Sequence, residues 1–224
     1  MTDRAQYPKR LIEVDLPIKR ISAHARREKF IRHGHISTLH IWWARRPLAA
    51  CRAVLCASLW PDPADELCPQ EFREAAVDAL EEFAQAVDEH AEIANLTEDD
   101  RSKWMDIARG RRLLDPESSE DWEAIQCLLL DFIAAFSAWE ASTDQHFLRT
   151  ARKLAKAAHL SLGGAPETRP LVVDPFAGGG AIPLEALRIG TDAFASDLDR
   201  PPFVGPVTVR GLGPRLHCGG GGRA

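Results

Sequence analysis

The 224-residue sequence has no apolar run of about 18 residues, and none of its five cysteines belongs to a Cys-x-x-Cys pair. The charged N-terminus is not followed by the apolar stretch of a secretory signal. The cysteine spacing supports neither a zinc ribbon nor a disulfide framework. We therefore expect a cytoplasmic protein with reduced thiols, and not a secreted or membrane protein.

Charge is divided sharply along the chain, although the net charge is only −5. Residues 1–52 carry 12 lysines and arginines against 4 acidic residues, whereas residues 61–126 carry 6 against 20. The basic segment suits a phosphate-rich partner such as DNA, because lysine and arginine release counterions from nucleic acid. The same division is also expected if the basic N-terminus packs on the acidic helices that follow it.

Apolar residues recur at helical spacing through the middle of the chain. Pro47 suits the first turn of a helix, which should end near Trp60 because two prolines follow. Further helices are expected at about residues 70–94, after Thr97, after Ser118, and at about 144–160 with a stop at Gly163-Gly164. We therefore expect an N-terminal region over residues 1–60 and an acidic helical insertion over residues 61–165.

The pattern changes near residue 168. Leu171-Val172-Val173 is a short apolar run of the kind found in a strand covered on both faces. A glycine-rich turn follows over residues 174–180, then a helix over 181–189 that stops at Gly190, and a second short strand over 192–196. This order over residues 168–199 predicts an α/β fold, with one nucleotide-binding half of a doubly wound sheet.

The turn carries Gly178, Gly179 and Gly180 in succession, and Asp197 lies at the end of the second strand. Glycine lets the backbone approach a ligand closely, and Asp197 is placed to accept hydrogen bonds from two ribose hydroxyls. A carboxylate at Asp174 would repel a pyrophosphate but suits a cation, such as the sulfonium and amino groups of S-adenosylmethionine. A dinucleotide site and a tight turn without a ligand stay open, although the loop lacks the Gly-x-Gly-x-x-Gly fingerprint.

Two parts of the chain resemble known families. The run Asp174-Pro-Phe-Ala-Gly-Gly-Gly-Ala-Ile-Pro-Leu-Glu-Ala, followed by Ala195-Ser-Asp-Leu, is similar to motifs I and II of amino-methylating DNA methyltransferases. The runs Lys9-Arg-Leu-Ile-Glu-Val-Asp-Leu-Pro-Ile and His33-Gly-His-Ile-Ser-Thr-Leu-His-Ile-Trp-Trp-Ala-Arg-Arg-Pro-Leu resemble the DUF1156 family, described as adenine-specific DNA methylases containing a zinc ribbon. The resemblance implies the start of a Rossmann-like S-adenosylmethionine-dependent methyltransferase sheet with a large helical insertion.

The resemblance also implies roles for single residues. Asp174, Phe176 and Gly178–Gly180 would surround the methionine part of S-adenosylmethionine, and Asp197 would hold its ribose. A looser likeness of residues 41–48 to motif X implies that Arg45 or Arg46 meets the cofactor's carboxylate, although a helix start or a phosphate contact would also explain these arginines.

No metal site is expected in the same region. His33, His35 and His40 have no fourth ligand nearby, so they do not make up a zinc site. The cysteine-rich ribbon implied by the family description does not occur in these 224 residues.

One expected motif is missing. Amino-methylating enzymes hold the flipped base with an Asp/Asn-Pro-Pro-Tyr/Phe loop, but the only Pro-Pro here, Pro201-Pro202, follows Arg200. Residues 201–224 contain seven glycines and four prolines, so we expect 200–224 to be an aberrant tail from truncation or frameshift, or a natively disordered one.

These features together predict an inactive fragment of a DNA adenine-N6 methyltransferase, with no catalytic residue assigned. A nucleic-acid-binding module that uses the basic N-terminus is the alternative. An interaction protein built on the acidic helices is a third possibility.

Overall fold

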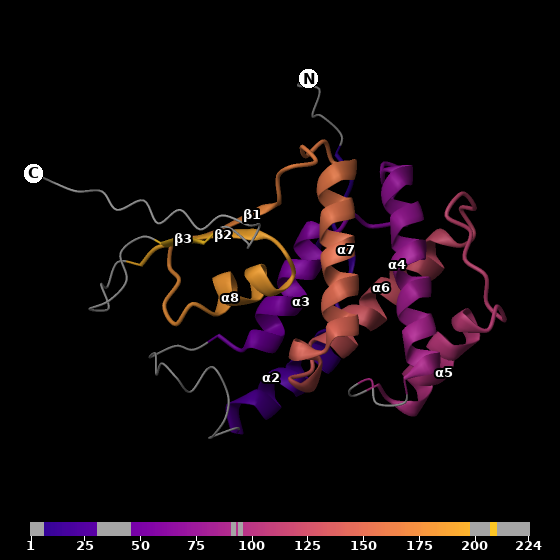
Figure 1. Ribbon diagram of the computed structural model, residues 1–224, viewed down its shortest axis with the longest axis horizontal. Coiled ribbons are helices and arrows are strands. Elements are labelled where there is room, and N and C mark those ends of the chain that lie inside the picture. Colours follow the sequence, from indigo (N-terminus) through magenta and orange to yellow (C-terminus); the bar gives the residue numbers. More distant parts are fainter. Residues whose placement is uncertain (1–6, 31–45, 91–92, 94–95, 198–206, 210–224) are drawn as a thin grey trace, which may run out of the picture.

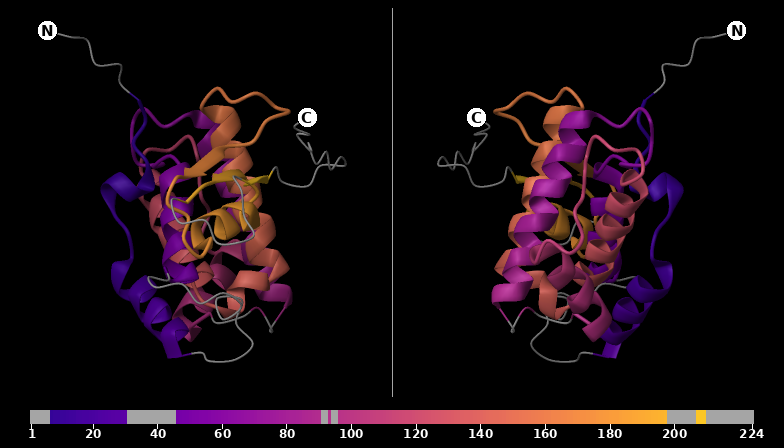
Figure 2. Two further views of the ribbon diagram at one scale, coloured as in Figure 1. Left: turned by 90° about the vertical axis from the view of Figure 1, so that its left-hand side faces the viewer. Right: turned by 90° about the vertical axis from the view of Figure 1, so that its right-hand side faces the viewer.

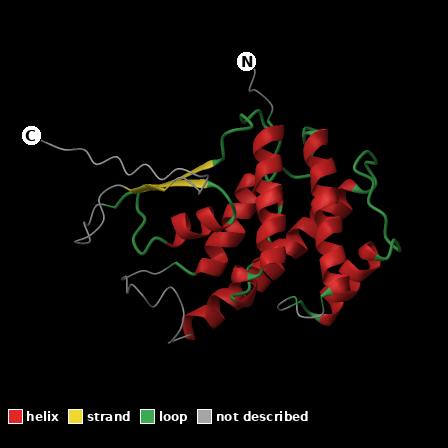
Figure 3. Cartoon of the chain, in the orientation of Figure 1, coloured by secondary structure: helices red, strands yellow, loops and turns green. Residues whose placement is uncertain are grey.

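The computed structural model describes residues 7–30, 46–90, 93, 96–197 and 207–209. A body of packed helices carries a small sheet on one side (Figures 1 and 3). The helices are α1 (Leu11–Val14), α2 (Ile18–Phe30), α3 (Leu48–Leu59), α4 (Gln70–Glu89), α5 (Glu98–Ala108), α6 (Trp122–Phe136), the 3₁₀ helix η2 (Glu140–Thr143), α7 (Gln145–Ser161) and α8 (Ala181–Arg188). None of these helices is both long and apolar enough to cross a bilayer.

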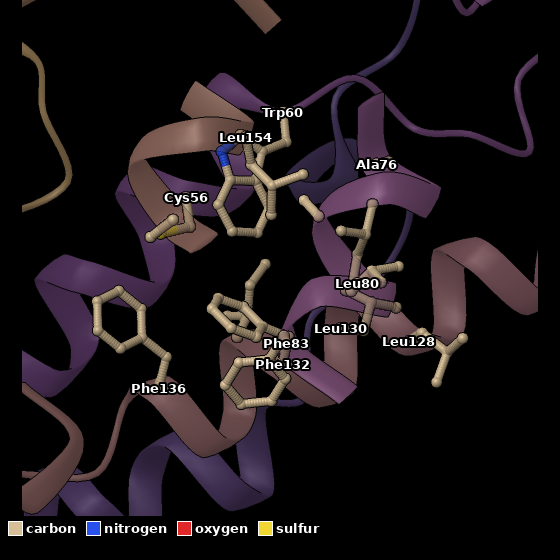
Figure 4. Packing of buried hydrophobic residues seen from close by; sticks show 14 of the residues in the cluster. Cys56, Trp60, Ala76, Leu80, Phe83, Leu128, Leu130, Phe132, Phe136 and Leu154 are labelled. Carbon is tan, nitrogen blue, oxygen red and sulfur yellow. The ribbon is translucent and has the colours of Figure 1, made fainter. Parts of the chain in front are cut away.

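The core of the helical body is built around aromatic rings. Phe83 of α4 lies 5.0 Å from Trp104 of α5, 5.0 Å from Phe132 of α6 and 4.8 Å from Phe147 of α7, measured between ring centroids. Figure 4 shows Phe83 and Phe132 at the centre of this cluster. All four rings are buried, and burial of each side chain contributes about 2–3 kcal/mol to folding. Because α4 supplies Phe83, it joins α5, α6 and α7 into one core.

Local signals in the sequence place most helix ends correctly. Thr97 accepts a hydrogen bond from the backbone N–H of Asp100, which starts α5 as expected. Asp144 accepts hydrogen bonds from the N–H groups of His146 and Phe147 at the start of α7. Helix α4 ends at Glu89, about one turn before the expected position near residue 94.

The sheet has three described strands in the order β1 (Leu171–Asp174), β2 (Asp192–Ala195) and β3 (Val207–Val209). Strands β1 and β2 are parallel and are joined through α8, as the sequence predicts. Strand β3 pairs with β2 in the antiparallel sense. Only 11 residues separate β2 from β3, and a parallel crossover needs about a dozen or more.

The fold is therefore a mixed one, in which helices predominate and a parallel β1–β2 pair is present. This confirms the α/β expectation at that level, while a complete Rossmann-like sheet stays a prediction. Strand β3 lies within the segment 200–224 that was expected to be aberrant or disordered. The other residues of that segment lie outside those that the structure describes.

The expectation that β1 is covered on both faces is wrong. The side chains of Leu171 and Val173 are 59% and 57% exposed, whereas Asp174 is buried. Helix α8 packs against β1 and β2, and no other described element covers the opposite face. The exposed apolar residues of β1, Leu171 and Val173, therefore lie on a face that no described element covers.

Parts of the basic N-terminal segment pack on acidic helices. Arg20 of α2 pairs with Asp100 of α5 and Asp131 of α6, at 2.5 and 3.0 Å between nitrogen and oxygen. Arg27 pairs with Glu140 at 2.6 Å. Some of the positive charge is thus neutralised within the chain, in agreement with the self-packing alternative.

Candidate cofactor site at the glycine loop

The glycine loop lies between β1 and α8, at the carboxyl end of the parallel strands. Gly178 and Gly180 have φ angles of +50° and +75°, a backbone conformation that residues other than glycine adopt only with strain. The N–H of Ala177 donates to the carbonyl of Ser196 on the β2 side, with a nitrogen–oxygen distance of 3.0 Å. The loop is therefore held against the end of β2, where open α/β sheets bind ligands.

Two carboxylates accept hydrogen bonds from backbone N–H groups of the loop. Asp174, at the end of β1, is buried and accepts a hydrogen bond from the N–H of Phe176 at 3.1 Å. Asp197, just past β2, accepts one from the N–H of Gly178 at 2.5 Å. The structure thus brings Asp174, Asp197 and the glycines together as the sequence analysis expected. These contacts also show that both carboxylates have a structural role in shaping the turn.

The outer side of the loop is open. The ring of Phe176 is 64% exposed, and Gly179 is exposed as well. A Cβ atom built on Gly180 would meet no heavy atom within 4 Å. A ligand could therefore approach the loop backbone at Gly180 with no side chain in the way.

The first turns of α3 lie beside this loop. Burial raises the pKa of the Cys51 thiol to about 12, and the nearby charges of Glu185 and Asp174 raise it further while that of Arg46 lowers it. Arg46 and Asp174 are thus both close enough to act on one side chain of α3. Arg46 is exposed just before α3, on the same side of the helix start as the charge of Asp174 that acts on Cys51. Arg45 and the histidines at 33, 35 and 40 lie outside the described residues.

The donor set suits an uncharged or cationic ligand better than a polyphosphate. Two carboxylates flank the loop, and its open side offers backbone groups and an aromatic ring. Among the residues that the structure describes, no cluster of three histidines, cysteines or acidic residues could hold a metal ion. Two carboxylates beside an open backbone therefore favour a cationic or hydroxyl-bearing ligand over an anionic one.

The chain was compared with known protein families. A family model described as "Protein of unknown function (DUF1156)" matches residues 15–100. The matched residues 15–100 are called the DUF1156 segment below. This confirms the resemblance of the N-terminal part. No curated protein and no solved structure matches the chain significantly.

The DUF1156 segment contains α2, α3 and α4, and it ends within the first turn of α5. The glycine loop lies outside it. The two regions nevertheless meet in space, because α3 packs directly on α8. Viewed from the side that carries the sheet, α8 and the strands lie in front of the helical body (Figure 2, left).

Sequence reasoning missed the residues that make this contact. Arg52 of the DUF1156 segment is 1% exposed and bonds through Nε to the Glu185 carboxylate of α8, which is fully buried, at 2.6 Å. The signal that could have found them is a single charged residue within an otherwise apolar helix. LAACRAVLCASL in α3 shows it, and AIPLEALR in α8 shows it less clearly because Arg188 is charged as well.

Proposed function

We propose that the glycine loop binds S-adenosylmethionine and that the chain is part of a methyltransferase acting on the N6 amine of adenine in DNA. The parallel β1–α8–β2 unit carries this proposal, because its loop backbone is open at Gly180 and bordered by Asp174 and Asp197. The similarity of residues 174–186 to motif I supports it.

In this proposal each residue has a defined task. Asp197 accepts hydrogen bonds from the ribose hydroxyls. Asp174 and the backbone of Gly178–Gly180 lie against the methionine part, and Arg46 binds its carboxylate. The cofactor would supply a methyl group on a sulfonium, and the protein would supply its position.

Binding of S-adenosylhomocysteine, measured by isothermal titration calorimetry, tests the proposal. Gly180→Ala should weaken binding, because a Cβ atom at φ +75° strains the loop and projects into its open side. Gly110→Ala is the matched control, since Gly110 has φ +66°, also has open space around it, and lies at the end of α5. Asp197→Ala should weaken binding through loss of the ribose contact.

Three results would refute this assignment. One is equal heats for the parent and the Gly180→Ala variant, and another is an equal loss in the Gly110→Ala control. The third is the absence of any heat with the parent protein, which would favour the tight turn without a ligand.

A second function, nucleic-acid binding by the basic segment, is favoured by the surface of α2. Lys19 and Arg26 are exposed and belong to no ion pair in the described part of the chain, whereas Arg20 is paired with acidic helices. We expect duplex DNA to bind at low salt and to dissociate steeply as salt approaches physiological levels. Fluorescence anisotropy with Lys19→Ala/Arg26→Ala beside the parent measures this. An affinity independent of salt would favour self-packing alone.

A further inference from the structure

Arg52 occupies a buried position at which three parts of the chain meet. Its Nε donates to Glu185 of α8, and its Nη1 donates to the carbonyls of Phe136, the last residue of α6, and of Ala138, at 3.1 Å for Ala138. The guanidinium also lies 4.8 Å from the centroid of the Phe136 ring. Arg52 itself belongs to α3, so one side chain joins α3, the end of α6 and α8.

Both oxygen atoms of the Glu185 carboxylate accept hydrogen bonds. One carboxylate oxygen accepts from Arg52, and the other accepts from Arg188, one turn later on α8. Glu185 lies in the second turn of α8, directly behind the glycine loop, and the N–H of Leu184 bonds to the carbonyl of Gly180. The position of the Glu185 carboxylate therefore sets the position of the first turn of α8 and of Gly180.

We propose that Arg52 is a positioning residue for the glycine loop: it anchors Glu185 and thereby aligns the loop with the start of α3, which Arg46 precedes. The DUF1156 segment then forms one wall of the site and is not a separate module. The role in ligand binding rests on the proposed function, whereas the ordering of the loop does not.

Arginine suits this position because its planar fork can serve two acceptors in different directions. A lysine keeps the charge but has a single ammonium group, which cannot reach both Glu185 and the carbonyls at the end of α6 in the same geometry. Arg52→Lys is therefore a conservative change that removes the alignment while leaving a cation beside Glu185.

A second buried arginine supplies a matched control. Arg73 of α4 donates to the carbonyls of Pro63 and Asp65, and its guanidinium lies 3.6 Å from the centroid of a Trp122 ring. Arg73 is thus a buried, stacked and carbonyl-bonded arginine that braces a loop of the helical body. It has no contact with the glycine loop, so Arg73→Lys reproduces the structural loss without the positioning effect.

Hydrogen–deuterium exchange on the ligand-free, 224-residue chain measures how often the backbone of the glycine loop opens. In Arg52→Lys we expect peptides within residues 175–190 to exchange about tenfold faster relative to those of α5, which contains neither Arg52 nor Arg73, and Arg73→Lys to leave this ratio unchanged. We also expect Arg52→Lys to bind S-adenosylhomocysteine about tenfold more weakly, as is typical when a supporting contact is lost.

Each outcome decides the proposal. An unchanged ratio in Arg52→Lys overturns it, and so does an equal change in Arg73→Lys, which would mean only general destabilisation. If Arg52→Lys does not fold, Glu185→Gln is read in the same way, since its one carbonyl oxygen can serve only one of the two arginines. A parent that binds no ligand refutes the proposed function, while the exchange ratio still decides the positioning role.

Discussion

At the scale of single residues, His24 of α2 lies among more positive than negative charge. Burial lowers the pKa of His24, and Arg20 lowers it next, followed by Arg27 of the same helix and Arg52 of α3. Glu140 of η2 acts in the opposite direction. The folded protein thus prefers a neutral imidazole at this position.

This environment predicts that acid weakens the fold through His24. Because the folded pKa lies below the unfolded value, the contribution is complete above about pH 6.5 and is lost as pH falls through the folded pKa. Guanidinium unfolding at pH 8 and pH 5 should show a larger loss of unfolding free energy in the parent than in His24→Gln. Equal losses in both proteins would contradict the prediction.

At the scale of secondary-structure elements, α7 depends on its N-cap residue, Asp144. Asp144 accepts hydrogen bonds from two N–H groups of the first turn, at 2.8 and 3.4 Å, and α7 then packs along α4. We expect Asp144→Ala to lower the free energy of unfolding by about 1 kcal/mol. Chemical denaturation measures this. Asp144→Asn is the control, because its side-chain oxygen still accepts, and it should lose less.

Strand β1 presents its apolar side chains to solvent. Leu171, Val173 and Phe176 are exposed together, and β1 has no neighbour on its outer edge among the described strands. Such an edge promotes association between chains. Leu171→Lys should therefore reduce light scattering on concentration, with an unfolding free energy within about 0.5 kcal/mol of the parent.

The control for this prediction is Leu113→Lys. Leu113 is 78% exposed but lies outside the helices and strands, and a single exposed apolar residue has little effect on solubility. If both variants reduce scattering equally, β1 is not the cause.

The elements that sequence predicted well depend on neighbouring residues. Thr97, Asp144 and Gly190 act within one or two turns, so α5, α7 and the end of α8 could be placed from local chemistry. The loop glycines and Asp197 were likewise paired correctly, because a strand–loop–helix–strand order fixes their meeting point.

Other features depend on distant parts of the chain. Whether β1 is covered on both faces depends on which elements pack over it, and its composition cannot report this. The bond between Arg52 and Glu185 joins residues 133 positions apart, and no periodicity within either helix indicates the partner. The antiparallel β3 arises in a segment whose composition predicted no strand.

At the scale of the whole molecule, the chain combines a candidate cofactor loop with a helical body but has no Asp-Pro-Pro-Tyr-type sequence. Cofactor binding alone does not transfer a methyl group, because the rate comes from groups that align the target amine with the sulfonium.

We therefore expect the 224-residue chain to transfer no methyl group to DNA. Incubation with tritiated S-adenosylmethionine and duplex or single-stranded DNA should leave the DNA unlabelled. An active amino-methylating DNA methyltransferase, assayed in parallel, is the positive control. Appreciable labelling by the 224-residue chain would show that acceptor residues lie elsewhere in it.

The contact between Arg52 and Glu185 also constrains the order of folding. Arg52 is synthesised long before Glu185. Until α8 has been made, its guanidinium is therefore solvated by water or bonded only to the carbonyls at the end of α6. Closing so long a loop is slow compared with forming single helices. We therefore infer that α8 docks after the helices that precede it, and that these helices pack around a charge whose counterion is synthesised 133 residues later.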